Sequence, residues 1–464
     1  MWSLRWQYRT KYALAAIATW CMLPFSGASL EAGNEAVYGR FDIDEIGAER
    51  LQELAGHPGF EWWMELDDQL LVLTTEATLV ELERNFACER LDVAPRPERL
   101  FVMHGARTDD FPAMDVDVLA MGGRRAVIQA RSNAQPIPPH AHHAHMRPFE
   151  PNQVLARQSA NLTALRQARL RQALLPQASM LAEEVDAQRW FNDVSTLSSY
   201  NRYTHGSEIL QARDWLVQQF AAMPGLTVET PVFEVGATAA FNVLATLTGS
   251  VRPDDLYIVG AHYDATSQSP GNAAPGAEDN ASGCAGVLEM ARIFTAHPPE
   301  ATVLFMCYSG EEQGLFGSED HASGLVSSGL DDQVRAVLTM DMIGYTGDAD
   351  LDCLLETSSS HSALADAFAA AAIDTDLRTV ISFNPFGSDH VPYLNRGMPA
   401  LLTIENDWDS YPCYHRTCDT ETNVSLAMGG ETLKMNVVAM AQMIGTQTSL
   451  FSDGFESGNA SAWN

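Results

Sequence analysis

The sequence is poor in basic residues, which limits the partners it can have. It contains 28 Lys and Arg against 60 Asp and Glu, so its formal net charge is −32 at pH 7. Nucleic acids and anionic membrane surfaces both need a basic binding face. The composition therefore argues against either as a partner. Hydrophobic residues make up 46% of the chain, which is enough to bury a sizeable core.

Long apolar runs are also scarce. One such run, at 12–25, follows Arg5, Arg9 and Lys11 and precedes the small residues SGAS. This pattern predicts a secretory signal peptide over 1–29. Because no later run reaches the about 18 apolar residues of a membrane span, we expect a protein that is secreted, extracellular or periplasmic, and not membrane-bound after signal removal.

Cysteine is infrequent, with seven residues in the whole chain, of which Cys21 lies in the predicted signal peptide. Exported proteins can keep disulfides. Cys413 and Cys418 lie five positions apart and are the best candidates for a local bridge. The sequence leaves open the pairing of Cys88, Cys284, Cys307 and Cys353.

Residues 30–135 combine strand-like runs at 70–75 and 125–130 with a helical pattern at 76–86. We expect a small α+β unit there, acting as an N-terminal pro-domain. Residues 136–184 are predicted to be a linker and processing region, with an Arg-containing helix over 153–176. We favour the interpretation that this helix belongs to a cleaved pro-segment. The alternative is an ordinary helix that packs on the next domain.

The linker also carries a histidine tract, which offers two interpretations. Four histidines lie within a Pro-rich segment: His140, His142, His143 and His145. They are either a metal site or, more commonly for such a composition, a solvated spacer.

From residue 185 to 446 the pattern changes to alternating helices and strands. Apolar, β-branched runs occur at 241–249, 256–262, 302–307, 336–344 and 399–404. Helical patterns occur at 208–223, 283–296, 361–373 and 429–444. This order predicts an α/β fold with a mostly parallel, mixed central sheet and helices on both faces. Residues 447–464 form an acidic tail, either a sorting signal or a disordered end.

Chemistry-bearing residues follow several of these strands. In such sheets ligands bind beyond the carboxyl ends of the strands. Zinc accepts imidazole nitrogen and carboxylate oxygen. Five potential ligands fall at this edge: His262, Asp279, Glu312, Asp341 and His415. A lone residue of this kind would be an ordinary cap or surface group, whereas five predict a metal site.

The motifs HYD, PGAEDNASG, SGEEQGLFGS, TMDMIGY and CYHRTCDT occur in this order between residues 185 and 446. Together they resemble the motif series of the M28 zinc aminopeptidases, of the secreted bacterial type. The resemblance implies two Zn²⁺ ions, with Asp279 bridging them, His262 and Asp341 on one, and Glu312 and His415 on the other. It also implies a disulfide between Cys413 and Cys418, as in secreted members of the family.

The resemblance further implies roles for three residues. Glu311 resembles the general base and acid, and Asp264 an aspartate counted as catalytic. Because Asp264 follows His262 by two positions, we expect its carboxylate to accept the free ring N–H of that ligand. Tyr414 resembles a tyrosine that binds the substrate carbonyl oxygen, or else it is a packing aromatic. Asp389 and His390, in SDHVPY, are interpreted as structural or substrate-side residues.

The resemblance implies that the protein is a hydrolase, a metalloprotease that removes residues from peptide or protein N-termini. We expect it to be made as a zymogen and to act as a monomer. A carboxypeptidase or a glutaminyl cyclase on the same fold remains an alternative. A non-catalytic binding module is a third, although such modules have usually lost ligands and none is missing here. The sequence does not reveal the preferred N-terminal side chain.

Overall fold

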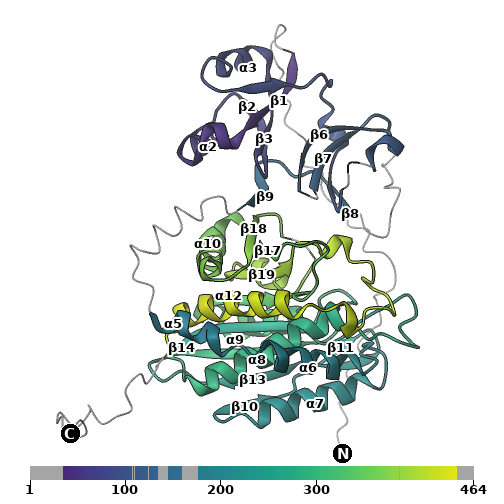
Figure 1. The fold of residues 1–464 in the computed structure, drawn as a ribbon, viewed down its shortest axis with the longest axis vertical. Helices are drawn as coiled ribbons and strands as arrows, with labels where there is room; N and C mark the ends of the chain where they lie inside the picture. The colour runs from purple at the N-terminus through teal and green to yellow at the C-terminus, as the bar shows by residue number, and fades with distance from the viewer. Residues whose placement is uncertain are drawn as a thin grey trace, which may run out of the picture.

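The computed structural model describes residues 35–106, 108, 110–123, 125–133, 145–158, 176–385 and 387–446. The predicted signal peptide at 1–29 and tail at 447–464 lie outside this range, as do His140, His142 and His143 of the histidine tract. Figure 1 shows a smaller N-terminal unit stacked on a larger unit that carries most of the helices.

The smaller unit is built on short antiparallel strands with three helices beside them. The strands predicted at 70–75 and 125–130 are present as β3 (Gln69–Thr75) and β7 (Arg125–Ala130), and the helix predicted at 76–86 is present over a shorter range, as α3 (Glu76–Leu82). One group of strands comprises β1 (Ala36–Asp42), β2 (Phe60–Leu66), β3 (Gln69–Thr75) and β4 (Cys88–Arg90). A separate sheet has the order β6 (Val116–Gly122), β7 (Arg125–Ala130), β5 (Leu100–His104) and β8 (His145–Pro148). The helices are α1 (Ile43–Ile46), α2 (Ala48–Ala55) and α3 (Glu76–Leu82).

The larger unit has a mixed central sheet, as predicted. Its strands, in spatial order, are β10 (Leu226–Glu229), β13 (Val243–Leu247), β15 (Ala301–Tyr308), β14 (Arg252–His262), β16 (Val334–Met340), β19 (Ala400–Glu405), β17 (Asp352–Glu356) and β18 (Arg378–Ser382). The four central strands β15, β14, β16 and β19 run parallel to one another, and β17 is antiparallel to β19. A two-stranded ribbon, β11 (Val232–Val235) and β12 (Thr238–Phe241), lies apart from the sheet.

Helices cover both faces of this sheet because the buried strands present apolar side chains alternately to each side. On β15, Val303 and Phe305 join one hydrophobic cluster, whereas Leu304 and Met306 join another. The first cluster includes residues of α5 (Pro176–Leu181), α6 (Ala187–Ser198), α7 (Ile209–Ala221), α8 (Gly283–Ala296), α10 (Ser362–Ala371) and α12 (Leu426–Ile444). The second includes residues of α9 (Phe316–Ser328) and α11 (Val391–Leu394).

Several ends of these helices are set by local capping. The side chain of Asp186 accepts the Arg189 N–H at 2.9 Å and starts α6, and Ser425 does the same for the Met428 N–H at the start of α12. Short 3₁₀ turns lie at Pro97–Arg99, Phe111–Ala113, Ala182–Glu184, Asp331–Gln333, Ser359–His361, Ala372–Asp374, Trp408–Ser410 and Glu421–Asn423. Among the described helices, none is both long and apolar enough to span a bilayer.

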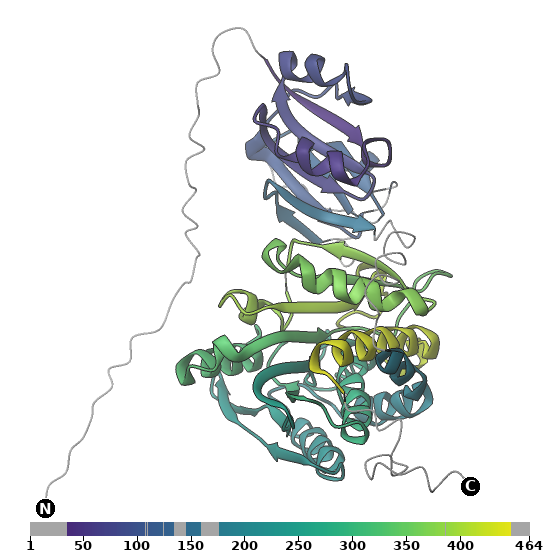
Figure 2. The same ribbon diagram turned by 90° about the vertical axis from the view of Figure 1, so that its left-hand side faces the viewer.

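One strand from the predicted linker connects the two units. β9 (Gln153–Gln158) pairs antiparallel with β18 and parallel with β2, so the sheet runs from the larger unit into the smaller one (Figure 2). The helix predicted over 153–176 is therefore wrong for 153–158, because Leu155 and Ala156 are fully buried between two neighbouring strands. The remainder of that predicted helix, 159–175, lies outside the described residues, and β8 and β9 both fall within the stretch predicted as a linker.

Candidate metal centre

The candidate ligands meet at one edge of the central sheet because their strands are parallel. β14 ends at His262, Asp341 follows β16, and Glu311 and Glu312 lie in the turn after β15. Asp279 comes from the irregular turn Ala277–Ser282 that precedes α8, in which the main chain of Asp279 is not helical. His415 lies in the loop between β19 and α12.

The five residues form two three-membered clusters that share Asp279. In the first, His262 Nε2 lies 3.4 Å from Asp279 Oδ1 and 3.4 Å from Asp341 Oδ1. In the second, His415 Nε2 lies 3.1 Å from Asp279 Oδ2 and 3.1 Å from Glu312 Oε2. The two carboxylate oxygens of Asp279 thus face different clusters.

The donor set fits a pair of zinc ions. Each cluster offers one imidazole nitrogen and carboxylate oxygens, which are ligands that zinc accepts. Asp279 Oδ2 and Asp341 Oδ1 are buried and accept no hydrogen bond from the described residues. Such oxygens are costly to bury unless a cation or donor satisfies them, so their arrangement favours a metal ion.

The electrostatics of the clusters also attract positive charge. Burial would lower the pKa of His415, but Asp279 and Glu312 raise it to about 11. Burial likewise opposes the charged form of His262, yet Glu311 and Asp341 raise its pKa well above the usual value. Burial raises the pKa of Glu312 to about 7. The carboxylates of the two clusters thus favour a positive charge between them, whether on a histidine or on a metal ion.

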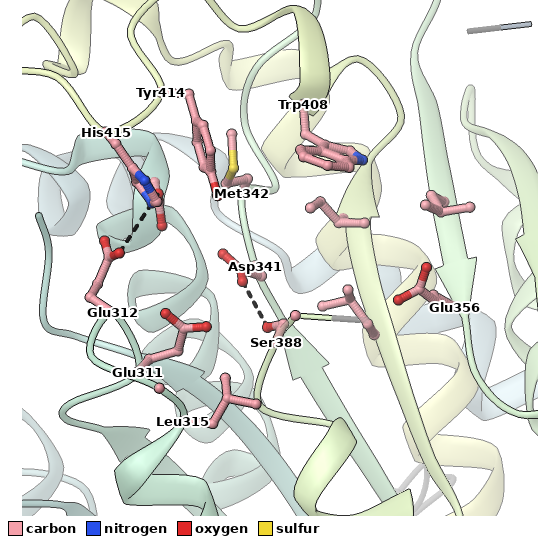
Figure 3. Close-up of a pocket in the computed structure, with 16 residues that line it drawn as sticks. Glu311, Glu312, Leu315, Asp341, Met342, Glu356, Ser388, Trp408, Tyr414 and His415 are labelled. Atoms are coloured by element: carbon pink, nitrogen blue, oxygen red, sulfur yellow. Dashed lines mark hydrogen bonds and ion pairs between the residues drawn. The ribbon is translucent and has the colours of Figure 1, made fainter. Parts of the chain in front are cut away.

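Glu311 lies beside the clusters but belongs to neither. Its carboxylate is 3.9 Å from His262 Nε2, and Figure 3 shows it pointing into the same space as Glu312. Burial raises the pKa of Glu311 well above its usual range, and the nearby Glu312 and Asp341 add to the rise. Gly310, with φ of 72°, permits the sharp turn that presents both glutamates.

Asp264 makes different contacts from those predicted. The His262 Nδ1 atom lies 3.1 Å from the main-chain oxygen of Asp264, whereas the carboxylate is at 3.7 Å. Instead, the carboxylate accepts the N–H groups of Glu311 at 3.2 Å and Glu312 at 3.3 Å, and the Thr204 hydroxyl at 2.9 Å. The expectation that this carboxylate accepts the ring N–H was wrong, because the turn after β15 supplies better-placed donors.

Several residues that hold the candidate ligands were not predicted from the sequence. Asp419 accepts the N–H groups of Glu278 and Asp279 at 2.9 and 3.1 Å, and the Ser388 hydroxyl donates to Asp341 Oδ2 at 2.7 Å. The fully buried Arg202 donates to the main-chain oxygens of Tyr263, Leu197, Pro275 and Gly276. Arg202 thereby ties together the segments that follow His262 and precede Asp279.

The loop carrying His415 is closed by a disulfide between Cys413 and Cys418. The ring of Tyr414 stacks on the imidazole of His415 with 3.9 Å between centroids. Tyr414 therefore both packs against a ligand and lines the pocket described next. Cys88, Cys284, Cys307 and Cys353 are all free thiols.

A pocket of about 290 Å³ opens beside the clusters. Four candidate ligands, Asp279, Glu312, Asp341 and His415, line it together with Glu311, and apolar residues complete the lining. Trp408 and Glu356 lie across the pocket from Glu311 and Glu312 (Figure 3). The apolar residues are Leu315, Met342, Leu354, Leu402, Ile404 and Trp408. The volume is near the lower limit for small-molecule sites, so the pocket suits one side chain rather than a long peptide.

Comparison with known proteins is consistent with this geometry. The model of peptidase family M28 matches residues 242–440. A probable aminopeptidase of Saccharomyces cerevisiae is 31% identical over 255 residues, covering 51% of this chain and 67% of the relative. A probable leucine aminopeptidase of Trichophyton verrucosum is 31% identical over 267 residues, covering 52% and 69%.

Two solved structures share the fold at low sequence identity. The LapA aminopeptidase of Legionella pneumophila has a TM-score of 0.52 and 18% identity, covering 75% of this chain and 98% of that chain. A glutaminyl cyclase of Macrostomum lignano has a TM-score of 0.50 and 18% identity, covering 58% and 93%. These likenesses support the fold and do not distinguish between the two activities.

Proposed function

Since the chain belongs to peptidase family M28 and is therefore a hydrolase, we propose that it is an exported aminopeptidase that cleaves the N-terminal peptide bond of peptides and proteins. The reaction would depend on Glu311 and on a pair of zinc ions held by the two clusters. The observation that carries the proposal is the pair of clusters sharing Asp279, with a separate carboxylate beside them.

The zinc ions would be held by His262, Asp279 and Asp341 in one cluster and by Asp279, Glu312 and His415 in the other. When bound, they supply a Lewis acid for the scissile carbonyl and lower the pKa of water. The protein's contribution is to orient the ligands through Asp419 and Ser388.

Glu311 is the proton carrier in this proposal. It takes a proton from the attacking water and delivers it to the leaving amine, which such groups do best when their pKa is raised towards neutrality. Burial raises the pKa of Glu311 in that direction. Asp264 is a positioning residue, because its carboxylate holds the main chain of Glu311 and Glu312. We assign the Tyr414 hydroxyl to the substrate carbonyl oxygen.

The charge of the pocket supports an aminopeptidase over a carboxypeptidase. Among its described lining residues there is no Lys or Arg, and Glu311 is a carboxylate that belongs to neither ligand cluster. A free N-terminal ammonium group is attracted by such a site, whereas a C-terminal carboxylate needs a basic partner.

We also propose that the N-terminal unit is a pro-segment removed after export. Its Tyr38 and Trp62 belong to the same hydrophobic cluster as Leu354, Leu402 and Trp408, which line the pocket. Removal of this unit would therefore change the environment of the pocket wall. N-terminal sequencing of the active, exported protein would test this, and an intact mature N-terminus near residue 30 would contradict it.

The aminopeptidase proposal is tested with a pair of chromogenic amino-acyl amides, one with a free amine and its N-acetylated twin. We expect cleavage of the first alone, lost on chelation and restored when Zn²⁺ is added. Metal analysis should give two zinc ions per chain. Equal cleavage of both substrates would rule out an aminopeptidase, and cyclisation of an N-terminal glutamine without hydrolysis would indicate a glutaminyl cyclase.

A further inference from the structure

The second ligand cluster contains the most exposed of the five candidate ligands. The side chain of His415 is 40% exposed, whereas those of Asp279 and Glu312 in the same cluster are 6% and 3% exposed. The main chain of His415 has a φ of 52°, in the left-handed region that residues other than glycine rarely adopt. Such a conformation persists only when the surrounding structure holds it. The position of this imidazole therefore depends on what fixes residues 411–419, which we call the His415 loop.

One end of the His415 loop is attached to the segment that carries Asp279. The carboxylate of Asp419 accepts the Asp279 N–H at 3.1 Å, and the main-chain oxygen of Asp419 accepts the Ala277 N–H, also at 3.1 Å. The disulfide within the loop closes the loop on itself and connects it to no other segment. These contacts hold the end of the loop behind the ligands and leave its outer side to another attachment.

The side-chain amide of Gln268 provides that second attachment. Its Nε2 donates to the Thr417 hydroxyl at 2.9 Å, and its Oε1 accepts the Thr417 N–H at 3.0 Å. Thr417 lies two positions after His415. One planar group therefore binds a side-chain atom and a main-chain atom of the same residue, which fixes both the distance and the orientation of this part of the loop.

Gln268 belongs to a segment that also holds Glu312, the other carboxylate ligand of this cluster. In this segment Asp264 accepts the Glu312 N–H at 3.3 Å, and Thr266 donates its N–H to Glu312 Oε1 at 3.0 Å. The second oxygen, Glu312 Oε2, lies 3.1 Å from His415 Nε2 (Figure 3). The same short stretch of chain thus holds one ligand directly and the other through the loop that carries it.

We propose that Gln268 is a positioning residue that raises the affinity of the second cluster for its metal ion by holding His415 beside Asp279 and Glu312. This inference rests on the proposed pair of zinc ions. Contacts that orient a metal ligand are worth about 10- to 100-fold in metal affinity. Because the Gln268 side chain is exposed, we expect the lower end of this range, about 10-fold, for the ion of the second cluster alone.

The test measures zinc affinity, which does not depend on the reaction. The purified protein is stripped of metal and titrated with Zn²⁺ against a chromophoric chelator, which gives a dissociation constant for each ion. His415→Ala keeps the whole first cluster and so identifies the constant that belongs to it. In Gln268→Ala the constant of the second cluster should rise about 10-fold, while that of the first cluster should stay within about twofold.

Three further variants separate positioning from general damage to the fold. Gln268→Glu keeps the side-chain length and can accept both the Thr417 N–H and the Thr417 hydroxyl, so it should restore the affinity of the second cluster. Thr417→Val removes the hydroxyl and keeps the N–H contact, so the rise should be smaller, about threefold. Asn272→Ala is the matched control, because Asn272 is an exposed amide of the same segment that donates to the Ser269 hydroxyl at 2.8 Å, and neither constant should change.

The outcomes distinguish this proposal from the proposed function. If Gln268→Ala changes neither constant, raises both equally, or has no greater effect than Asn272→Ala, then Gln268 has no positioning role and the two-zinc site stands. If the unmodified protein binds only one zinc ion, the proposed function is contradicted, and the role of Gln268 is contradicted with it.

Discussion

The replacement Asp264→Asn tests whether this residue acts by fixing the turn that carries both glutamates. The two carboxylate oxygens accept two main-chain N–H groups, from Glu311 at 3.2 Å and Glu312 at 3.3 Å. An asparagine keeps one acceptor oxygen and turns an NH₂ group towards the other donor. One buried N–H then loses its acceptor, which costs about 1–3 kcal/mol.

This magnitude predicts both a stability and an activity change. The free energy of unfolding in urea should fall by about 2 kcal/mol. Movement of the Glu311 carboxylate by about 1 Å is enough to lower kcat by about 100-fold. Metal content should stay at two per chain, because the Asp264 carboxylate is not part of either ligand cluster.

Three measurements on the same preparation test the positioning role of Asp264. They are kcat on the free-amine substrate, the zinc content and the midpoint of urea-induced unfolding. Thr204→Val is the control, since it removes one hydroxyl donor to the Asp264 carboxylate and leaves both N–H contacts in place. A variant Asp264→Asn with kcat within about threefold of the unmodified enzyme would refute the positioning role. Loss of zinc would instead show that Asp264 acts mainly through His262.

Further changes test other parts of the structure. Glu311→Gln should lower kcat by about 10²–10⁴-fold with both zinc ions retained, and retained activity would remove Glu311 from its role. Gly429→Ala should destabilise the fold by about 1–3 kcal/mol in urea unfolding, because the added Cβ would lie 2.0 Å from Cη2 of Trp190. Gly324→Ala, in the exposed part of α9 with nothing within 4 Å, should stabilise by about 0.5–1 kcal/mol, and an equal loss at both sites would contradict the packing argument. Burial lowers the pKa of His321 to about 4, so the stability it contributes should be lost as the pH falls from about 6.5 towards 4. In the His321→Gln variant, the free energy of unfolding should therefore fall by up to about 2 kcal/mol less at pH 5 than in the unmodified protein. If the free energy of unfolding depends on pH in the same way in both proteins, this prediction is wrong.

The convergence of several candidate ligands could be predicted from the sequence because these residues follow recognisable strand patterns. His262 and Asp341 directly follow apolar strand patterns, and Glu312 follows β15 by a short turn. Parallel strands bring their carboxyl ends to one edge, so chain order alone brings these residues together. The disulfide between Cys413 and Cys418 was equally accessible, because it closes a loop of adjacent sequence.

The supporting residues could not be found in this way, because their partners are main-chain groups of distant segments. Arg202 donates to the oxygen of Tyr263, which is 61 positions away, and Asp419 accepts the N–H of Asp279, which is 140 positions away. Main-chain donors and acceptors have no side-chain signature in a sequence. β9 was missed for a related reason, since its short apolar run becomes a strand only through its pairing with β2 and β18.

The adjacency of Glu311 and Glu312 follows from the way their turn is anchored. Asp264 binds the N–H groups of both residues, so both side chains extend from the same fixed stretch of main chain. From there Glu312 reaches His415, at 3.1 Å, while Glu311 lies 3.9 Å from His262 and outside the ligand clusters. A single carboxylate could not serve as both ligand and proton carrier, because an oxygen bound to a metal is a poor base. Two glutamates on one anchored turn therefore place both groups at the pocket with a single set of supporting hydrogen bonds.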